Sequence, residues 1–283
     1  MANVSVTAYN PELVCEIDVL ELEYQQDLAV RIYQPKGTGP FPALLDVHGG
    51  AWTLGDRTGA EVRDRALAES GIVVAAIEFR LAPEHPYPAQ VADFNLAVRW
   101  LKSRATDFQG DPQSVGAIGS SSGGHTVLLS AMRPHHPSYS SLDLPDSDVD
   151  ATLRYVLSVY PIVDPYARYQ FAQETEKTFL VESSEGYFLT TDAMKEGNPF
   201  QILQRRENAY LPPTLIVQGT ADENLPVQVT EQFADAYREA GGTIELEIFQ
   251  DTPHAFAEHP GPETDRAVAL MKKFVARCLT DAA

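Results

Sequence analysis

The segment Gly119-Ser120-Ser121-Ser122-Gly123 constrains this chain more than any other part of it. It follows residues 114–118, which predict a short buried strand, and it precedes residues 124–132, which are typical of a helix. A serine on such a strand-to-helix turn lies in a sharp, strained conformation, and small neighbours are needed two positions away on both sides. Ser121 has glycine at both of these positions, so we expect it to be an exposed nucleophile.

A glycine-rich turn, His48-Gly49-Gly50-Ala51-Trp52, follows an earlier predicted strand at residues 41–47. Glycines after a strand let the backbone approach a ligand and turn its amides inward. Acyl transfer creates an oxyanion, and each preorganised N–H group aimed at it contributes roughly 3–4 kcal/mol. We therefore predict an oxyanion hole formed by the amides of Gly50, Ala51 and Ser122. A simple glycine turn is the alternative.

Two more side chains follow later strands in a meaningful order. Residues 213–217 predict a strand that leads to Asp222, and residues 243–249 predict one that leads to His254. The order Ser, Asp, His indicates a catalytic triad in which Ser121 attacks, His254 transfers the proton and Asp222 orients the imidazole. Asp164, after the strand at residues 153–160, is the alternative acid.

Strands alternate with helices along the chain, which predicts an α/β fold with a mostly parallel sheet of about eight strands and helices on both faces. With 283 residues, 44% of them hydrophobic, one domain over residues 1–283 is expected. The predicted strands are residues 15–22, 28–33, 41–47, 72–77, 114–118, 153–160, 213–217 and 243–249. The predicted helices are residues 58–69, 89–102, 124–132, 226–240 and 262–279.

Residues 163–211 interrupt this alternation of strands and helices, and they contain many aromatic and charged side chains. At this position an insertion lies over the carboxyl ends of the strands, where ligands bind in open α/β sheets. We therefore predict a helical lid, with the alternative that its aromatic residues only anchor the insertion. The expected substrate contacts are Trp52, Tyr187, Phe188 and Phe256, although core packing explains Trp52 and Phe256 equally well.

The formal net charge of −19 argues against nucleic acid and anionic membranes as partners. Cys15 and Cys278 are too few for a metal site or a disulfide framework, which favours a reducing compartment. Residues 1–10 lack the pattern of a signal peptide, and no run is long enough for a membrane span. The expectation is a cytoplasmic protein without metal or cofactor, and a homodimer remains open.

The chain resembles α/β-hydrolases of the hormone-sensitive-lipase-like esterase branch from about residue 28 to residue 279. The resemblance rests on the serine turn, the His-Gly-Gly turn and the segment EFRLAPEHPYPA at residues 78–89. Ala51 replaces the third glycine usual in that branch, and Ser120 and Ser122 replace an aspartate and an alanine. The turn His48-Gly49-Gly50-Ala51-Trp52 also resembles a loop of kynurenine formamidases.

Together, these patterns predict a serine hydrolase that cleaves carboxylic esters through an acyl-enzyme. The expected substrate is a small molecule with a small to medium acyl group and a neutral alcohol part. An aryl formamidase or other amidase on the same triad is the alternative within enzymes. A catalytically silent binding protein on the same fold is a more remote alternative, since receptors of that kind in the resembled branch have lost the histidine that this chain keeps as His254.

Overall fold

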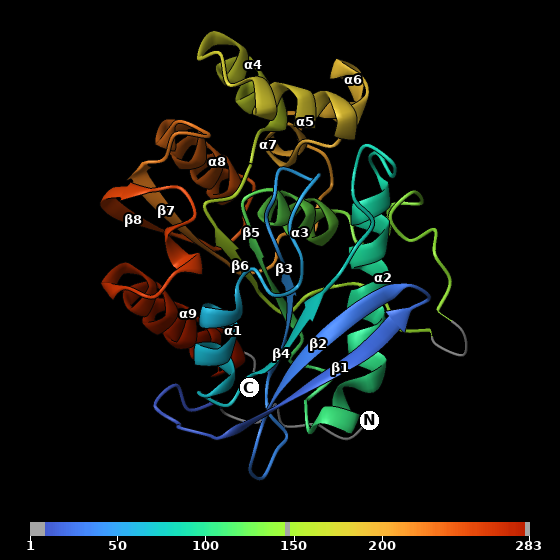
Figure 1. The fold of residues 1–283 in the computed structure, drawn as a ribbon, viewed down its shortest axis with the longest axis vertical. Coiled ribbons are helices and arrows are strands. Elements are labelled where there is room, and N and C mark those ends of the chain that lie inside the picture. Colours follow the sequence, from blue (N-terminus) through green and yellow to red (C-terminus); the bar gives the residue numbers. More distant parts are fainter. Residues whose placement is uncertain (1–8, 145–147, 281–283) are drawn as a thin grey trace.

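The computed structural model describes residues 9–144 and 148–280. Its sheet has eight strands in the order β1-β2-β4-β3-β5-β6-β7-β8 (Figure 1). β1 pairs with β2 and β2 with β4 in antiparallel fashion, and all other neighbours are parallel. The strands are β1 (Ile17–Gln25), β2 (Leu28–Pro35), β3 (Ala43–Val47), β4 (Val73–Ile77), β5 (Gly116–Ser120), β6 (Val156–Val159), β7 (Thr214–Ala221) and β8 (Ile244–Pro253).

The helices lie between the strands as the alternating pattern predicts, so the predicted α/β fold is confirmed. Several strand ends differ from the prediction: β1 pairs with β2 up to their two-residue turn and ends at Gln25 rather than at residue 22. β7 and β8 pair with each other as far as Ala221 and Pro253, rather than ending at residues 217 and 249. The helices are α1 (Glu61–Ala68), α2 (Ala89–Arg104), α3 (Ser122–Met132), α4 (Pro165–Glu174), α5 (Thr178–Phe188), α6 (Thr191–Glu196), α7 (Pro199–Gln204), α8 (Val227–Glu239) and α9 (Pro262–Thr280).

The central strands β3, β4, β5 and β6 are buried on both faces, whereas β1 at the edge is mostly exposed. Successive side chains of a strand point to opposite faces, so neighbouring residues belong to different core clusters. On β3, Leu44 belongs to a core cluster with Leu67 of α1 and Phe274 of α9. Its neighbour Leu45 belongs to a second cluster that contains residues of α2, α3 and α8, among them Phe94. The helices therefore cover both faces, and the sheet holds β5 rigidly in the middle.

The insertion at residues 163–211 contains α4, α5, α6 and α7, which lie beyond the end of the sheet from which α3 starts (Figure 1). Asp164 caps α4 by accepting from the amide of Ala167 at 2.9 Å. The same carboxylate oxygen accepts from Asn198 Nδ2 at 2.7 Å, and Asn198 in turn caps α7. The first and last helices of the insertion are thus tied together at the sheet.

The two glycines that flank Ser121 are needed for close backbone packing. A Cβ atom on Gly119 would lie 2.5 Å from the carbonyl oxygen of Gly123, and one on Gly123 would lie 2.2 Å from that of Val47. Backbone oxygens within a strand or a helix cannot move aside as a flexible side chain can. The start of α3 can therefore approach β3 only with glycine at position 123.

We expect Gly123→Ala to destabilise the protein, because the added methyl group overpacks the contact with β3. Overpacking costs typically about 1–3 kcal/mol, which lowers the melting temperature by at least about 2 °C in a chain of this size. Thermal unfolding followed by circular dichroism measures the change. Gly261→Ala is the control, since its Cβ would meet no atom within 4 Å; equal melting temperatures of the two variants would contradict the packing argument.

Candidate active site

Ser121 lies between β5 and α3 with φ 53° and ψ −118°. A non-glycine residue at positive φ stores about 1–3 kcal/mol of strain and needs surrounding structure to hold it. The amide of Ser121 donates to the carbonyl of Val159 at 2.9 Å, and its own carbonyl accepts from the amide of Ile162 at 3.2 Å. Pairing with β6 and the segment after it thus holds the serine on the turn.

The three residues predicted as a triad form one continuous chain of hydrogen bonds. His254 Nε2 lies 2.8 Å from Ser121 Oγ, and His254 Nδ1 lies 2.7 Å from Asp222 Oδ2. Asp222 follows β7, and His254 follows β8. Since β7 and β8 are neighbouring parallel strands, their carboxyl ends deliver both side chains to the same edge of the sheet.

The Asp222 carboxylate is buried, and both of its oxygens accept hydrogen bonds. Oδ2 also accepts from Gln218 Nε2 at 2.8 Å, and Oδ1 accepts from the amide of Asn224 at 2.8 Å. Burial acts to raise the pKa of Asp222, but the hydrogen bonds, above all that from His254, outweigh it and hold this pKa below its ordinary value. The carboxylate is therefore ionised at neutral pH and can stabilise an imidazolium.

The turn after β3 adopts a conformation that L-residues rarely take. Gly50, Ala51 and Trp52 have φ values of 116°, 51° and 65°. The amides of Gly50 and Ala51 make no hydrogen bond within the described residues, whereas the amide of Trp52 donates to Ser122 Oγ at 3.2 Å. The turn is thus fastened to the start of α3 while the two predicted oxyanion donors keep their N–H groups available.

His48 fastens the other side of the same turn. Its Nδ1–H donates to the carbonyl of Gly49 at 2.6 Å, and its ring stacks on Phe79 with centroids 4.2 Å apart. These two contacts fix the His48 ring against the loop.

A cavity of about 340 Å³ contains Ser121 and His254. Gly50 and Ala51 of the oxyanion turn line it, as do Phe179 and Leu180 of α5. The insertion therefore supplies an apolar wall beside the oxyanion turn, where Leu180 packs in one cluster with Ala51. Sequence reasoning missed Leu180 and also Arg168, another residue that lines the cavity.

The four predicted substrate contacts lie elsewhere. Trp52, Tyr187 and Phe188 are buried, and the rings of Trp52 and Tyr187 stack with centroids 5.0 Å apart. Phe256 packs on Tyr160 and Phe249. These aromatic side chains join the insertion and the loops to the core, and they are absent from the residues that line the cavity beside Ser121.

The indole of Trp52 is fixed by a buried histidine. Trp52 Nε1 donates to His125 Nδ1 at 3.2 Å, and His125 Nε2 donates to the carbonyl of Gly197 at 2.8 Å. Burial lowers the pKa of His125 to about 4, so the ring is neutral at pH 7. His125 therefore links the oxyanion turn to the insertion instead of taking part in proton transfer.

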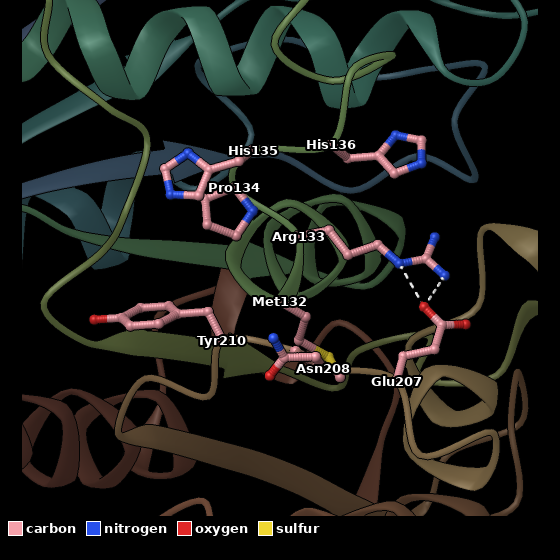
Figure 2. Close-up of a pocket in the computed structure, with 9 residues that line it drawn as sticks. Met132, Arg133, Pro134, His135, His136, Glu207, Asn208 and Tyr210 are labelled. Carbon is pink, nitrogen blue, oxygen red and sulfur yellow. Dashed lines mark hydrogen bonds and ion pairs between the residues drawn. The ribbon is translucent and has the colours of Figure 1, made fainter.

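A larger hollow of about 550 Å³ lies past the end of α3, lined by residues 132–136 and 207–210 (Figure 2). Arg133 forms an ion pair there with Glu207 at 2.6 Å. His135 and His136 border the hollow, but within the described residues no group of three His, Cys, Asp or Glu side chains could hold a metal ion. None of the triad residues lines it, so the smaller cavity is the candidate active site.

The sheet order, the strained serine turn and the arrangement of Ser121, His254 and Asp222 are those of an α/β-hydrolase. A model of the BD-FAE family matches residues 30–237. The chain belongs to this family, and the resemblance to esterases of the hormone-sensitive-lipase-like branch is confirmed.

Relatives with curated names include esterases. Esterase LipC of Mycobacterium tuberculosis is 30% identical over 214 residues, which are 71% of this chain and 49% of LipC. Carboxylesterase NlhH of the same species is 37% identical over 124 residues, 43% of this chain and 39% of NlhH. The chain spans about half the length of the first curated relatives it matches.

Solved structures share the fold over nearly the whole chain. The esterase Est2 of Thermogutta terrifontis with propionate bound has a TM-score of 0.71 and 25% identity, covering 93% of this chain and 94% of that one. The carboxylesterase EstE1 from a metagenomic library has a TM-score of 0.76 and 20% identity, covering 94% and 90%. Among the helices of the described residues, none has the length and apolar character that a membrane crossing requires.

We expect Ser121→Ala to lower kcat on an ester by about 10⁴–10⁶, because it removes the attacking oxygen. Ser122→Ala is the matched control: it keeps the backbone amide and loses only the hydroxyl that accepts from Trp52. It should retain at least about a tenth of kcat while losing about 1–3 kcal/mol of stability, since a buried amide is left unpaired. Equal loss of kcat in both variants would assign the wrong serine.

The acid is tested by a second pair of variants. Asp222→Asn should lower kcat by about 10⁴, because an amide stabilises the wrong imidazole tautomer. Asp164→Asn changes the capping carboxylate at α4 and should keep at least about a tenth of kcat. Steady-state kinetics of both purified variants decides, and the reverse ranking would move the acid to Asp164.

Proposed function

We propose that this protein is a serine hydrolase that cleaves carboxylic esters of small to medium acyl chain length. The observation that carries the proposal is the unbroken hydrogen-bonded chain from Asp222 through His254 to Ser121 beside a cavity. The names of its relatives, among them an esterase and a carboxylesterase, support the same reaction class. The intact triad disfavours a silent binding protein, because a receptor has no need of an oriented base.

In the first half of the reaction, Ser121 Oγ attacks the ester carbonyl while His254 Nε2 accepts the serine proton. Asp222 stabilises the imidazolium that forms. The amides of Gly50, Ala51 and Ser122 are proposed to donate to the oxyanion of the tetrahedral intermediate, each contributing roughly 3–4 kcal/mol. His254 then gives its proton to the leaving alcohol, and an acyl group remains on Ser121.

In the second half, a water molecule takes the place of the alcohol. His254 removes its proton as it attacks the acyl carbonyl, and the same amides receive the second oxyanion. Collapse of this intermediate returns the proton to Ser121 and releases the carboxylic acid. His254 Nε2 gives or takes the proton in every step of this proposed mechanism.

The size of the cavity and its wall favour short acyl chains. About 340 Å³ lies at the small end of ligand pockets, which span about 300–1,000 Å³. We propose that residues 163–211 act as a lid within a single domain, with Phe179 and Leu180 of α5 gripping the substrate. Apolar burial would then supply about 25 cal/mol per Å² until the cavity is filled.

Hydrolysis of an aryl formamide is the alternative function of the same triad, and no contact in the described residues favours it. The residue that suggested it, Trp52, is 1% exposed and packs under α5. The same triad can attack either carbonyl, so N-formylkynurenine belongs in the substrate panel.

We expect kcat/KM for p-nitrophenyl esters to rise from acetate to about butanoate or hexanoate and then to fall as the cavity fills. Leu180→Ala enlarges the cavity and should shift this maximum to longer chains. N-formylkynurenine should be cleaved more slowly than the best ester. Absence of ester turnover, or faster cleavage of the formamide, would overturn the proposed function.

The matched control is Leu189→Ala. Leu189 follows the same helix, but it is 65% exposed and does not line the cavity. This variant should keep the chain-length profile of the parent. If Leu180→Ala also kept that profile, α5 would not be the wall that limits the acyl group.

A further inference from the structure

Arg168 of α4 lines the cavity that contains Ser121 and His254, and its side chain is almost entirely buried, with 2% exposure. A buried guanidinium normally has a carboxylate beside it, because an unpaired buried charge is costly. Arg63 of this protein follows that rule: it is fully buried and forms ion pairs with Asp46 and Asp64.

Arg168 lacks such a partner. Within residues 9–144 and 148–280 it forms no ion pair with a carboxylate, and its Nε has no hydrogen-bond partner. Nη1 donates to Ser184 Oγ at 3.1 Å, and the guanidinium lies 5.0 Å from the ring centre of Trp52. A neutral hydroxyl and an indole face orient the cation without neutralising it.

The guanidinium of Arg168 carries its positive charge at neutral pH. Burial lowers the pKa of Arg168 to about 10, and the charge of Asp222 opposes this effect. The side chain is therefore protonated at neutral pH, with donors that nothing in the described chain satisfies. Packing alone does not account for it, since an apolar side chain of similar size would fill the same space without the desolvation cost.

From this geometry, and resting on the proposed esterase function, we propose that Arg168 binds a carboxylate carried by the substrate. The preferred substrate would then be an ester with one free carboxylate, such as a half-ester of a dicarboxylic acid or an acylated hydroxy acid. A planar guanidinium matches a carboxylate through two parallel N–H donors.

A single negative charge fits this cavity better than a phosphate dianion. Asp56 and Glu258 also line it, and the chain carries a net charge of −19. A dianion would meet this negative field with two charges and only one cation to receive them. The carboxylate is thus the anion that the surroundings of Arg168 favour.

The test compares esters that differ only in charge. Monoethyl succinate and ethyl succinamate carry a carboxylate or an amide in the acyl part, and acetoxyacetate and acetoxyacetamide do so in the alcohol part. In at least one pair we expect kcat/KM of the native enzyme to favour the acid by about tenfold or more, as a charge-assisted hydrogen bond implies. Proton release at constant pH follows all four reactions.

Arg168→Gln should abolish this preference, so that the ratio of kcat/KM for the acid to that for the amide falls to about one within each pair, and Arg168→Lys should keep part of it. Arg206→Gln removes a positive charge from the same insertion at an exposed position outside the cavity. This control should keep the full preference. Equal rates within both pairs for the native enzyme, or a preference that survives in Arg168→Gln, would overturn the role of Arg168.

Failure of this inference is distinct from failure of the proposed function. Cleavage of p-nitrophenyl butanoate and of the amide esters without an acid preference would leave the esterase in place and remove Arg168 from recognition. If Arg168→Gln did not fold, calorimetry on the native enzyme would decide with succinamate and succinamide, which differ by one charge. Tighter binding of succinamate supports the proposal even without turnover, and equal binding overturns it.

Discussion

The close contact between the start of α3 and the end of β3 is the constraint on which the site depends. Gly123 lies so near the carbonyl of Val47 that a methyl group would not fit between them. The same contact places Ser121 beside the turn that leaves β3, so the nucleophile and the predicted oxyanion donors share one rigid corner. Ser121 keeps its positive φ because the pairing of β5 with β3 and β6 fixes the backbone that leads into the turn.

A second layer of contacts joins this corner to the insertion. Trp52 donates its amide to Ser122 and its indole N–H to His125, while its ring stacks on Tyr187 of α5. The rings of Trp52 and Tyr187 thus hold the oxyanion turn against the insertion. The position of α5, and with it the wall formed by Leu180, is therefore coupled to the catalytic corner.

The triad could be predicted because each of its members follows a recognisable buried strand, and parallel strands bring their carboxyl ends to one edge. The substrate contacts could not be predicted in the same way. Tyr187 lies two turns beyond Leu180 on α5, and which of them meets the cavity depends on how the helix is packed. Its aromatic ring made Tyr187 the expected substrate contact. A large aromatic ring is also well suited to packing in the core, however, and Tyr187 is buried there. The sequence did not indicate that Arg168 lines the cavity, because an arginine in a charged segment is usually exposed.

The two fully buried arginines show how a structural cation differs from a recognition cation. Arg63 is paired with Asp46 and donates to Ser120 at 2.6 Å, so its charge is neutralised within the fold. Arg168 lines the cavity beside His254 and forms no ion pair with a carboxylate of residues 9–144 and 148–280, although the charge of Asp222 acts on it from a distance. A substrate carboxylate would pair with Arg168 at the moment of binding, as Asp46 pairs with Arg63 within the fold.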